Sequence, residues 1–250
     1  MSLNLKEKMT NYPNTKIHNT LPKILRHRSV SMPDTVALRD KDLGIWNEIT
    51  WKQYNNNVSY LALALSKRGF KTGDVIGLIG DNKPSWLYFE LAAQAVGGMS
   101  LGIYRDTLDE EVGYLINAAK VNFVYAEDQE QVDKILTIKR PKNSQITMFY
   151  EDSRGLKELN DPHIVDMLEL MNEGQAIANK TPNKYNQMID KVSDKQEAIL
   201  CTTSGTTSNP KLAMLPGGKF VEHVLRYLNV DPKTDTDEYV SVLPFPWIME

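Results

Sequence analysis

Residues 75–103 read VIGLIGDNKPSWLYFELAAQAVGGMSLGI, and this stretch decides the fold. Val75 to Gly80 is an apolar run of strand length, and Met99 to Ile103 is a second one. Between them, Pro84 to Val96 has the length of a helix, and Gly97-Gly98 closes it. Strands that are apolar throughout and separated by helices are typical of a parallel sheet covered on both faces. The stretch therefore predicts an α/β fold.

The same alternation continues on both sides of this stretch. Downstream, we predict helices over 109–119 and 129–136 and strands over 122–125 and 145–150. Upstream, we predict a helix from Thr20-Leu21-Pro22, a strand pair over 36–40 and 46–51, and a helix from Tyr54 that ends at Gly69. Because crossovers between parallel strands are right-handed, the expected fold is a doubly wound parallel sheet with helices on both faces.

The remaining sequence suggests a division into four parts. These are an N-terminal extension (1–19), a first α/β subdomain (20–150), a polar connecting region on the surface (151–197) and the start of a second α/β subdomain (198–250). In the connecting region we predict helical pieces at 164–171 and 185–191. In the last part we predict strands at 198–203, 213–215 and 239–243 and a helix at 219–228. Since the chain stops one step past a predicted interior strand, we expect a fragment whose second subdomain is incomplete and whose C-terminal domain is absent.

Composition excludes several classes of protein. The 250 residues are 41% hydrophobic and 24% charged, and 29 basic against 32 acidic residues give a net charge of -3. This balance does not fit a nucleic-acid-binding protein. The single cysteine, Cys201, excludes an internal disulfide, and Met1 to Tyr12 lacks the apolar core of a signal peptide. We expect a cytoplasmic protein, with peripheral membrane contact and oligomeric state left open.

The segment most indicative of chemistry is Thr203-Ser204-Gly205-Thr206-Thr207-Ser208-Asn209-Pro210-Lys211, which follows a predicted buried strand. Hydroxyls and unpaired backbone N–H groups are the donors that phosphate oxygens need, and a flexible lysine adds a positive charge. The segment does not match Gly-x-x-x-x-Gly-Lys-Ser/Thr, because Pro210 and Leu212 stand where that motif has Gly and Ser or Thr. A plain turn rich in Ser, Thr and Gly is the structural alternative. The sequence therefore predicts a triphosphate-binding loop.

This loop is closely similar to the phosphate loop of the adenylate-forming superfamily, which includes acyl-CoA synthetases, luciferases and peptide-synthetase adenylation domains. The resemblance runs from about Thr20 to Glu250, with Gly73-Asp74-Val75 and Leu243-Pro244 as further matches in the same order. It implies that the fold is the N-terminal part of the large adenylate-forming domain. Leu243 to Ile248 looks more like the corresponding segment of fatty-acid ligases than that of peptide-synthetase domains. In the family this segment lines the acyl pocket.

The resemblance also implies an activity. A carboxylic acid, here a fatty acid, would attack ATP with the help of Mg²⁺, and coenzyme A would then accept the acyl group. Ser204, Thr206, Thr207 and Lys211 are implied to bind the β and γ phosphates, with Thr203 and Gly205 shaping the loop. Ser208 also lies in the nucleotide-binding loop, and Trp247 is implied to face the substrate pocket.

The family's catalytic and metal-binding residues are expected beyond Glu250. We therefore assign no catalytic residue and no metal ligand within this chain, and expect it to be inactive alone.

Some residues depart from the family pattern. Ser208 and Leu212 stand where the family usually has Gly, and Pro216-Gly217-Gly218 replaces a common Ser-His. Trp247 occupies the position of a His or other aromatic gate residue. We expect nucleotide binding to survive, because the hydroxyl and lysine positions are intact. An aryl or short-chain acid–CoA ligase and a nucleotide-binding pseudoenzyme remain as alternatives.

Overall fold

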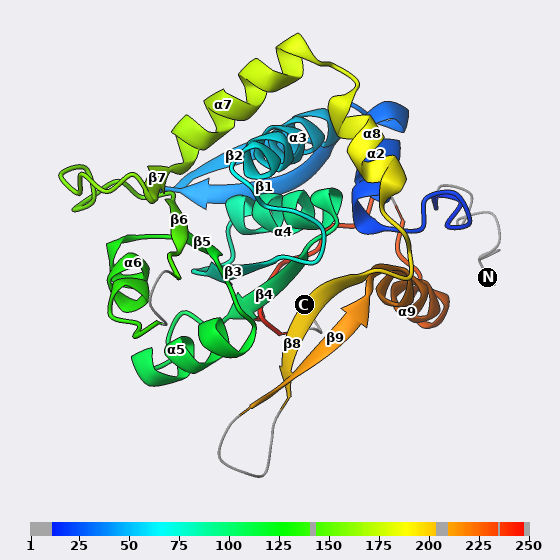
Figure 1. Ribbon diagram of the computed structural model, residues 1–250. Coiled ribbons are helices and arrows are strands. Elements are labelled where there is room, and N and C mark those ends of the chain that lie inside the picture. Colours follow the sequence, from blue (N-terminus) through cyan, green and yellow to red (C-terminus); the bar gives the residue numbers. More distant parts are fainter. Residues whose placement is uncertain (1–11, 141–143, 204–209, 235, 248–250) are drawn as a thin grey trace.

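The structure, a computed structural model, describes residues 12–140, 144–203, 210–234 and 236–247 (Figure 1). In these residues the main feature is a seven-stranded sheet in the order β7-β6-β5-β3-β4-β8-β9. Its strands are β3 (Val75–Ile79), β4 (Met99–Ile103), β5 (Phe123–Ala126), β6 (Thr147–Tyr150), β7 (Ile164–Asp166), β8 (Glu197–Thr203) and β9 (Lys211–Pro216). All neighbouring pairs are parallel except β8 and β9. The predicted parallel sheet is therefore confirmed, with one antiparallel strand at its edge.

Helices cover both faces of this sheet (Figure 1). One face carries α2 (Leu21–Ser31), α3 (Trp51–Lys67), α4 (Pro84–Val96), α7 (Met167–Lys180) and α8 (Lys184–Lys191). The opposite face carries α5 (Asp109–Ala118) and α6 (Gln129–Leu136), and α9 (Gly217–Val230) follows β9. Two apolar cores result, one on each side of the sheet, which confirms the doubly wound α/β fold.

The central elements form as their residues predict. Every residue of β3 is buried, as a strand covered on both faces requires. Helix α3 begins with a capping box, in which the Thr50 hydroxyl accepts from the Gln53 amide and the Gln53 side chain accepts from the Thr50 amide. Helix α4 ends at Gly97, whose φ of +91° is the left-handed conformation that glycine adopts at no steric cost.

A separate hairpin precedes α3. Strands β1 (Val36–Asp42) and β2 (Ile45–Thr50) pair antiparallel, with Leu43 and Gly44 in the turn. This confirms the predicted strand pair, except that Trp51 begins α3 instead of ending the strand. The reason is the cap at Thr50, which starts the helix there.

The interpretation of residues 151–197 as a surface connection is wrong for 164–191. Strand β7, in place of the first turn of the predicted helix, pairs with β6 and extends the main sheet. Helix α7 packs on α3 so closely that a Cβ added to Gly174 would lie 1.8 Å from the backbone oxygen of Tyr60. Val165, Leu170 and Ile189 belong to the buried core. The region is polar on average because an amphipathic helix is polar on its outer face, even where its inner face packs into a core.

Two expectations for the last part also differ from the structure. Residues 239–243 form no strand in the described part of the chain, and Tyr239, Val240 and Val242 are exposed. Their β-forming side chains do not suffice, because a strand needs a partner for its backbone groups. Moreover, β8 pairs with β4, so the proposed boundary at residue 198 does not separate two sheets within the described residues.

Candidate functional site

The carboxyl ends of the parallel strands meet at one edge of the sheet, and the connections part there. The chain leaves β3 for α4 on one face, whereas it leaves β4 and β5 for α5 and α6 on the other face. In open α/β sheets, ligands bind in the crevice outside the carboxyl ends at such a switch point. This edge is therefore the first place to look for a site.

The predicted phosphate loop belongs to the same edge. Thr203 is the last residue of β8, which runs parallel to β4, so it lies at the carboxyl edge. Thr203 is paired with Lys211, the first residue of β9, and the Thr203 hydroxyl donates to the Lys211 carbonyl over 3.4 Å. The structure thus brings together the two ends of the loop, and both residues are exposed.

The middle of the loop lies outside the described residues. This concerns Ser204, Gly205, Thr206, Thr207 and Ser208, whose assignment to the phosphates stays a prediction. Leu212, by contrast, is described, and it lies in β9, where its side chain packs against the core on the α5 and α6 face.

Tyr114 on α5 binds the residue that precedes β9, a contact that was not anticipated from the sequence. Its hydroxyl donates to the carbonyl of Pro210 over 3.1 Å. The bond joins the beginning of β9 to a helix almost a hundred residues earlier in the chain (a separation of 96 residues). No local signal marks such a contact, because it depends on how α5 is placed under the β8–β9 hairpin.

Arg105 ties together the three loops that follow β3, β4 and β5. Its guanidinium donates to Asp81 after β3 and, over 3.3 Å, to Asp128 after β5. Lys134 donates to the backbone carbonyl of Arg105 over 2.7 Å. Partial burial opposes the charge on Arg105. The nearby carboxylates of Asp81 and Asp128 have the larger combined effect, and the pKa of Arg105 is raised. The network fixes the loops that surround the switch point.

Beneath this network lies a buried acidic side chain. Glu127 is 6% exposed, accepts from the backbone amide of Asp81 over 2.5 Å and pairs with Lys83 over 3.2 Å. Burial opposes the charge on Lys83, yet Glu151 and Glu127 raise its pKa. The carboxylate therefore holds the backbone and the side chain on either side of Asn82 in place.

A second polar cluster includes Ser85, in the first turn of α4. The hydroxyls of Ser85 and Tyr125 lie 2.8 Å apart, and Tyr125 donates to Glu151 over 2.6 Å. Burial, reinforced by the nearby Glu151 carboxylate, raises the pKa of Tyr125 well above its ordinary value. Tyr125 is therefore a neutral donor over the whole physiological range.

The predicted substrate residue Trp247 stands at the end of a segment that crosses this edge. Asn82 binds the segment at Leu243 and Phe245, and Pro246 packs on Gly102 in β4. Trp247 itself is 48% exposed, and its backbone amide donates to the carbonyl of Pro244. The segment passes the carboxyl end of the sheet, while the role of Trp247 in binding substrate stays a prediction.

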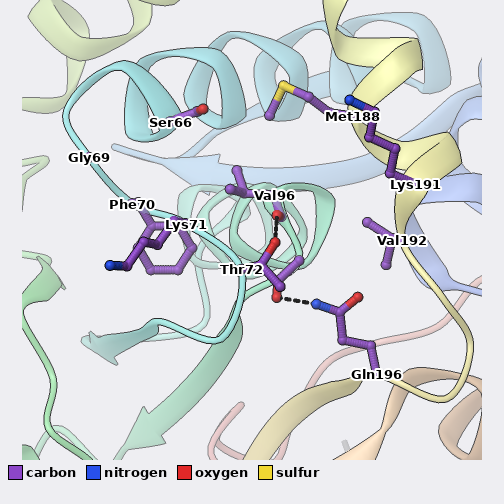
Figure 2. A pocket seen from close by; sticks show the side chains of 11 residues that line it. Ser66, Gly69, Phe70, Lys71, Thr72, Val96, Met188, Lys191, Val192 and Gln196 are labelled. Atoms are coloured by element: carbon purple, nitrogen blue, oxygen red, sulfur yellow. Dashed lines mark hydrogen bonds between the residues drawn. The ribbon is translucent and has the colours of Figure 1, made fainter.

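A cavity lies at the opposite edge of the sheet (Figure 2). It has a volume of about 380 Å³ and is lined at the amino ends of β3, β4 and β8, with Thr72, Gly97 and Gln196 among its walls. Gln196 donates to the Gly97 carbonyl over 2.5 Å, and Thr72 donates to the Val96 carbonyl over 3.2 Å. These side chains satisfy the last carbonyls of α4, which accounts for their presence. We therefore place the candidate site at the carboxyl edge.

The described residues offer no ready place for a metal ion. No group of three His, Cys, Asp or Glu side chains in this part of the chain is arranged to hold one. Cys201 in β8 is partly buried, and burial, followed by the nearby Glu90, raises its pKa. A thiol with a raised pKa is a poor nucleophile, so we assign Cys201 no part in the chemistry.

Comparison with known proteins identifies the family. The model of the AMP-binding enzyme family matches residues 25–250. The long-chain-fatty-acid–CoA ligase ACSBG2 of Rattus norvegicus is 28% identical over 235 residues, which are 92% of this chain and 34% of the relative. Its counterpart from Xenopus laevis is 30% identical over 183 residues, which are 73% of this chain and 24% of the relative. The chain thus spans about a third or less of the length of the curated relatives it matches.

Solved structures show the same fold. The luciferase-like enzyme from the nonluminescent mealworm Zophobas morio superposes with a TM-score of 0.69. The match covers 86% of this chain and 47% of that enzyme, at 16% sequence identity. At this identity the likeness concerns the fold alone, whereas the family match covers nine-tenths of the sequence. The chain belongs to the AMP-binding enzyme family.

Proposed function

We propose that this chain carries the nucleotide-phosphate site of an ATP-dependent acyl-CoA synthetase that activates a long-chain fatty acid. Membership of the AMP-binding enzyme family supports the nucleotide. The rat and Xenopus relatives, both described as long-chain-fatty-acid–CoA ligases, support the acid and the acceptor.

The observation that carries the proposal is the β8–β9 hairpin at the carboxyl edge of the sheet. Thr203 and Lys211 pair at its open end, so the two ends of the predicted phosphate loop lie together at the edge where ligands of such sheets bind. We assign Ser204, Thr206, Thr207 and Lys211 to the β and γ phosphates of ATP. Thr203 and Gly205 shape the loop, and Ser208 belongs to the same site.

In the proposed reaction, an oxygen of the fatty-acid carboxylate attacks the α-phosphorus of ATP. A bond forms between the carboxylate oxygen and the α-phosphorus, and the bond from the α-phosphorus to the oxygen that bridges to the β-phosphorus breaks. Pyrophosphate leaves with the electron pair of the broken bond, which gives acyl-AMP. The thiolate of coenzyme A then attacks the acyl carbon and AMP leaves. The part of this chain is to hold and orient the triphosphate and to offset its negative charge through Lys211.

Mg²⁺ is the expected companion of ATP, and when bound it neutralises phosphate charge. The described residues do not fit such a site, because no group of three carboxylate, His or Cys side chains among them is arranged for a metal. We therefore assign no ligand to Mg²⁺ in this part of the chain.

Two further parts of the proposal concern the setting. The single cysteine, Cys201, supports a reducing compartment such as the cytoplasm.

Apolar side chains at the tip of the β1–β2 hairpin support peripheral membrane contact, since Leu43, Ile45 and Trp46 are 94%, 68% and 61% exposed. No helix in the described ranges is long and apolar enough to cross a bilayer. Vesicle flotation of the wild type and of Leu43→Asp would test the contact. We expect the wild type to bind the vesicles and Leu43→Asp not to bind them.

The decisive experiment is carboxylate-dependent exchange between ATP and pyrophosphate. It should be run on the 250-residue chain and on the longest form of the protein that its gene encodes. The panel of acids should include palmitate, butyrate and an aromatic acid. We expect exchange in the longest form, strongest with palmitate, and formation of palmitoyl-CoA when coenzyme A is added.

Other results would redirect the proposal. Exchange that is strongest with the aromatic or the short acid would leave adenylation in place and replace the fatty acid. ATP binding without exchange in either form would instead indicate a nucleotide-binding pseudoenzyme.

A further inference from the structure

We propose that Asn82 is a positioning residue that fixes residues 241–246 across the carboxyl ends of β3 and β4 and thereby shapes the binding site for the carboxylic acid. The clamp itself is a feature of the structure, and its role for the acid rests on the proposed function. Asn82 lies in the loop directly after β3, at the switch point of the sheet.

The Asn82 side chain makes three hydrogen bonds to this distant segment. Its amide nitrogen donates to the hydroxyl of Ser241 and to the carbonyl of Leu243, both over 2.7 Å. Its amide oxygen accepts from the backbone N–H of Phe245 over 3.0 Å. Only a side-chain amide offers donor and acceptor groups in this arrangement, so neither a carboxylate nor an apolar side chain can replace it.

The loop that carries Asn82 is itself held firmly. The backbone amide of Asp81 donates to the buried Glu127, and Lys83 pairs with the same carboxylate. Arg105 binds Asp81 from the other side. Asn82 therefore stands on a fixed support between two anchored neighbours.

The segment, in contrast, has little regular structure of its own. Residues 239–243 pair with no strand in the described part of the chain. Val240 and Val242, on either side of Ser241, are each 76% exposed. The bonds from Asn82 therefore act directly on a segment whose path no strand pairing fixes.

Two packing contacts continue the path toward β4. The ring of Phe245 lies 6.0 Å from the ring of Trp86 on α4. A Cβ added to Gly102 would lie 2.8 Å from the Cα of Pro246, so the segment touches the backbone of β4 and leaves no room for a larger residue. The segment consequently forms a wall over the carboxyl ends of both strands, where a ligand of this fold binds.

The first test measures the clamp without relying on activity. Hydrogen exchange of the peptide covering 239–247 should be compared in the 250-residue chain and in Asn82→Leu, Asn82→Asp and Ser241→Ala. We expect exchange at Phe245 to be faster by about tenfold or more in Asn82→Leu, because several hydrogen bonds are lost together. Asn82→Asp should be affected as well, since a carboxylate cannot donate to the Leu243 carbonyl. Asn160→Leu, a change at an exposed loop position, is the matched control.

The second test measures the role of the clamp for the acid. In the longest form of the protein, Asn82→Leu should raise the KM for the acid by about tenfold while the KM for ATP stays within about twofold, because a displaced wall misplaces one substrate only. Gly102→Ala moves the same segment without touching Asn82 and should change the same constant, with Gly113→Ala on α5 as its control.

The outcomes separate the two proposals. Unchanged exchange at Phe245 in Asn82→Leu overturns the clamp, and a loss of apparent kcat with both KM values unchanged overturns its role for the acid in favour of a purely structural one. If the wild type shows no acid-dependent exchange of pyrophosphate, the proposed function fails and the role for the acid fails with it, while hydrogen exchange still decides the clamp.

Discussion

Thr203 and Lys211 lie directly opposite each other at the open end of the β8–β9 ladder, with the Thr203 hydroxyl 3.4 Å from the carbonyl of Lys211. The pairing brings the two ends of the predicted phosphate loop together at the carboxyl edge of the parallel sheet. Lys211 therefore lies at the carboxyl edge of the sheet, on a strand that pairs with β8 and is bonded through Pro210 to Tyr114.

This relationship predicts the effect of removing the lysine. Lys211→Ala should weaken the binding of ATP by about tenfold or more, because a hydrogen bond to a charged group contributes about 1.5–3 kcal/mol. Isothermal titration with ATP measures the effect. Lys180→Ala, which removes an exposed lysine at the end of α7, should leave the affinity unchanged. Equal losses in both variants would mean that only the net charge matters and that Lys211 does not contact the phosphates.

The contact between α3 and α7 predicts contrasting effects of two Gly→Ala changes. In Gly174→Ala the new methyl group would meet the backbone oxygen of Tyr60, which cannot move aside without shifting α3. We expect a loss of about 2 kcal/mol or more in the free energy of unfolding.

Gly113→Ala on α5 is the matched control, because the nearest side-chain atom is 3.8 Å from the added Cβ. There we expect a gain of about 0.5–1 kcal/mol from helix propensity. Urea unfolding of both variants makes the comparison. Equal stability of the two variants would contradict the close packing of α7 on α3.

An ion-pair network on the same helix pair predicts a pH dependence. Partial burial opposes ionisation of Glu173, but hydrogen bonds from Lys67 and Arg68 outweigh it and lower its pKa. A lowered carboxyl pKa stabilises the fold above the unfolded value and loses that effect as the pH falls through the folded value. Glu173→Gln should therefore cost about 1 kcal/mol at pH 7 and progressively less below about pH 4.5.

The measurement is the urea midpoint of the wild type and of Glu173→Gln between pH 3 and 7. Glu158→Gln, at an exposed loop position, is the control and should change little at any pH. A difference between the wild type and Glu173→Gln that stays constant with pH would show that the charge of Glu173 is not the cause.

Removing the charge of Glu90 on α4 should affect stability at pH 7 in the direction opposite to removing that of Glu173. Burial raises the pKa of Glu90, against a smaller lowering by the hydrogen bond from Ser100. A raised carboxyl pKa means that the folded state holds its proton more tightly than the unfolded chain, so stability decreases as the pH rises through the unfolded value toward the folded one. Glu90→Gln should therefore raise the melting temperature at pH 7.

Thermal unfolding at pH 4 and pH 7 tests this expectation. The gain should be larger at pH 7 than at pH 4, since at pH 7 the carboxyl is ionised in the unfolded chain and its raised pKa in the fold then lowers the stability of the wild type. A lower melting temperature of Glu90→Gln at pH 7 would instead mean that the charged form makes a favourable contact.

Much of the fold could be predicted because its central strands are buried on both faces. Continuous apolar runs separated by helices of regular length leave few alternatives, and 84–96, 99–103 and 129–136 match the structure residue for residue. Local caps set the boundaries, as the glycine at 97 does for α4.

The errors arose where partners are distant. The strand at 164–166 exists because β6 offers a free edge, and 239–243 remains irregular because no strand of the described residues pairs with it. Neither fact is written in the local sequence, since backbone pairing depends on which segments meet.

For the candidate site, the sequence by itself determined which donor groups are available, and from these it predicts phosphate binding. The hydroxyls, glycine and lysine of 203–211 are a set of donors suited to phosphate, whatever the rest of the chain does. The tertiary structure alone decided the surroundings. It brought Asn82 to Leu243 across 161 residues, Tyr114 to Pro210 across 96 and Arg105 to both Asp81 and Asp128. Such contacts form only when the parallel strands bring their carboxyl ends to one edge, because the chemistry of a side chain is local whereas its neighbours are set by the topology of the sheet.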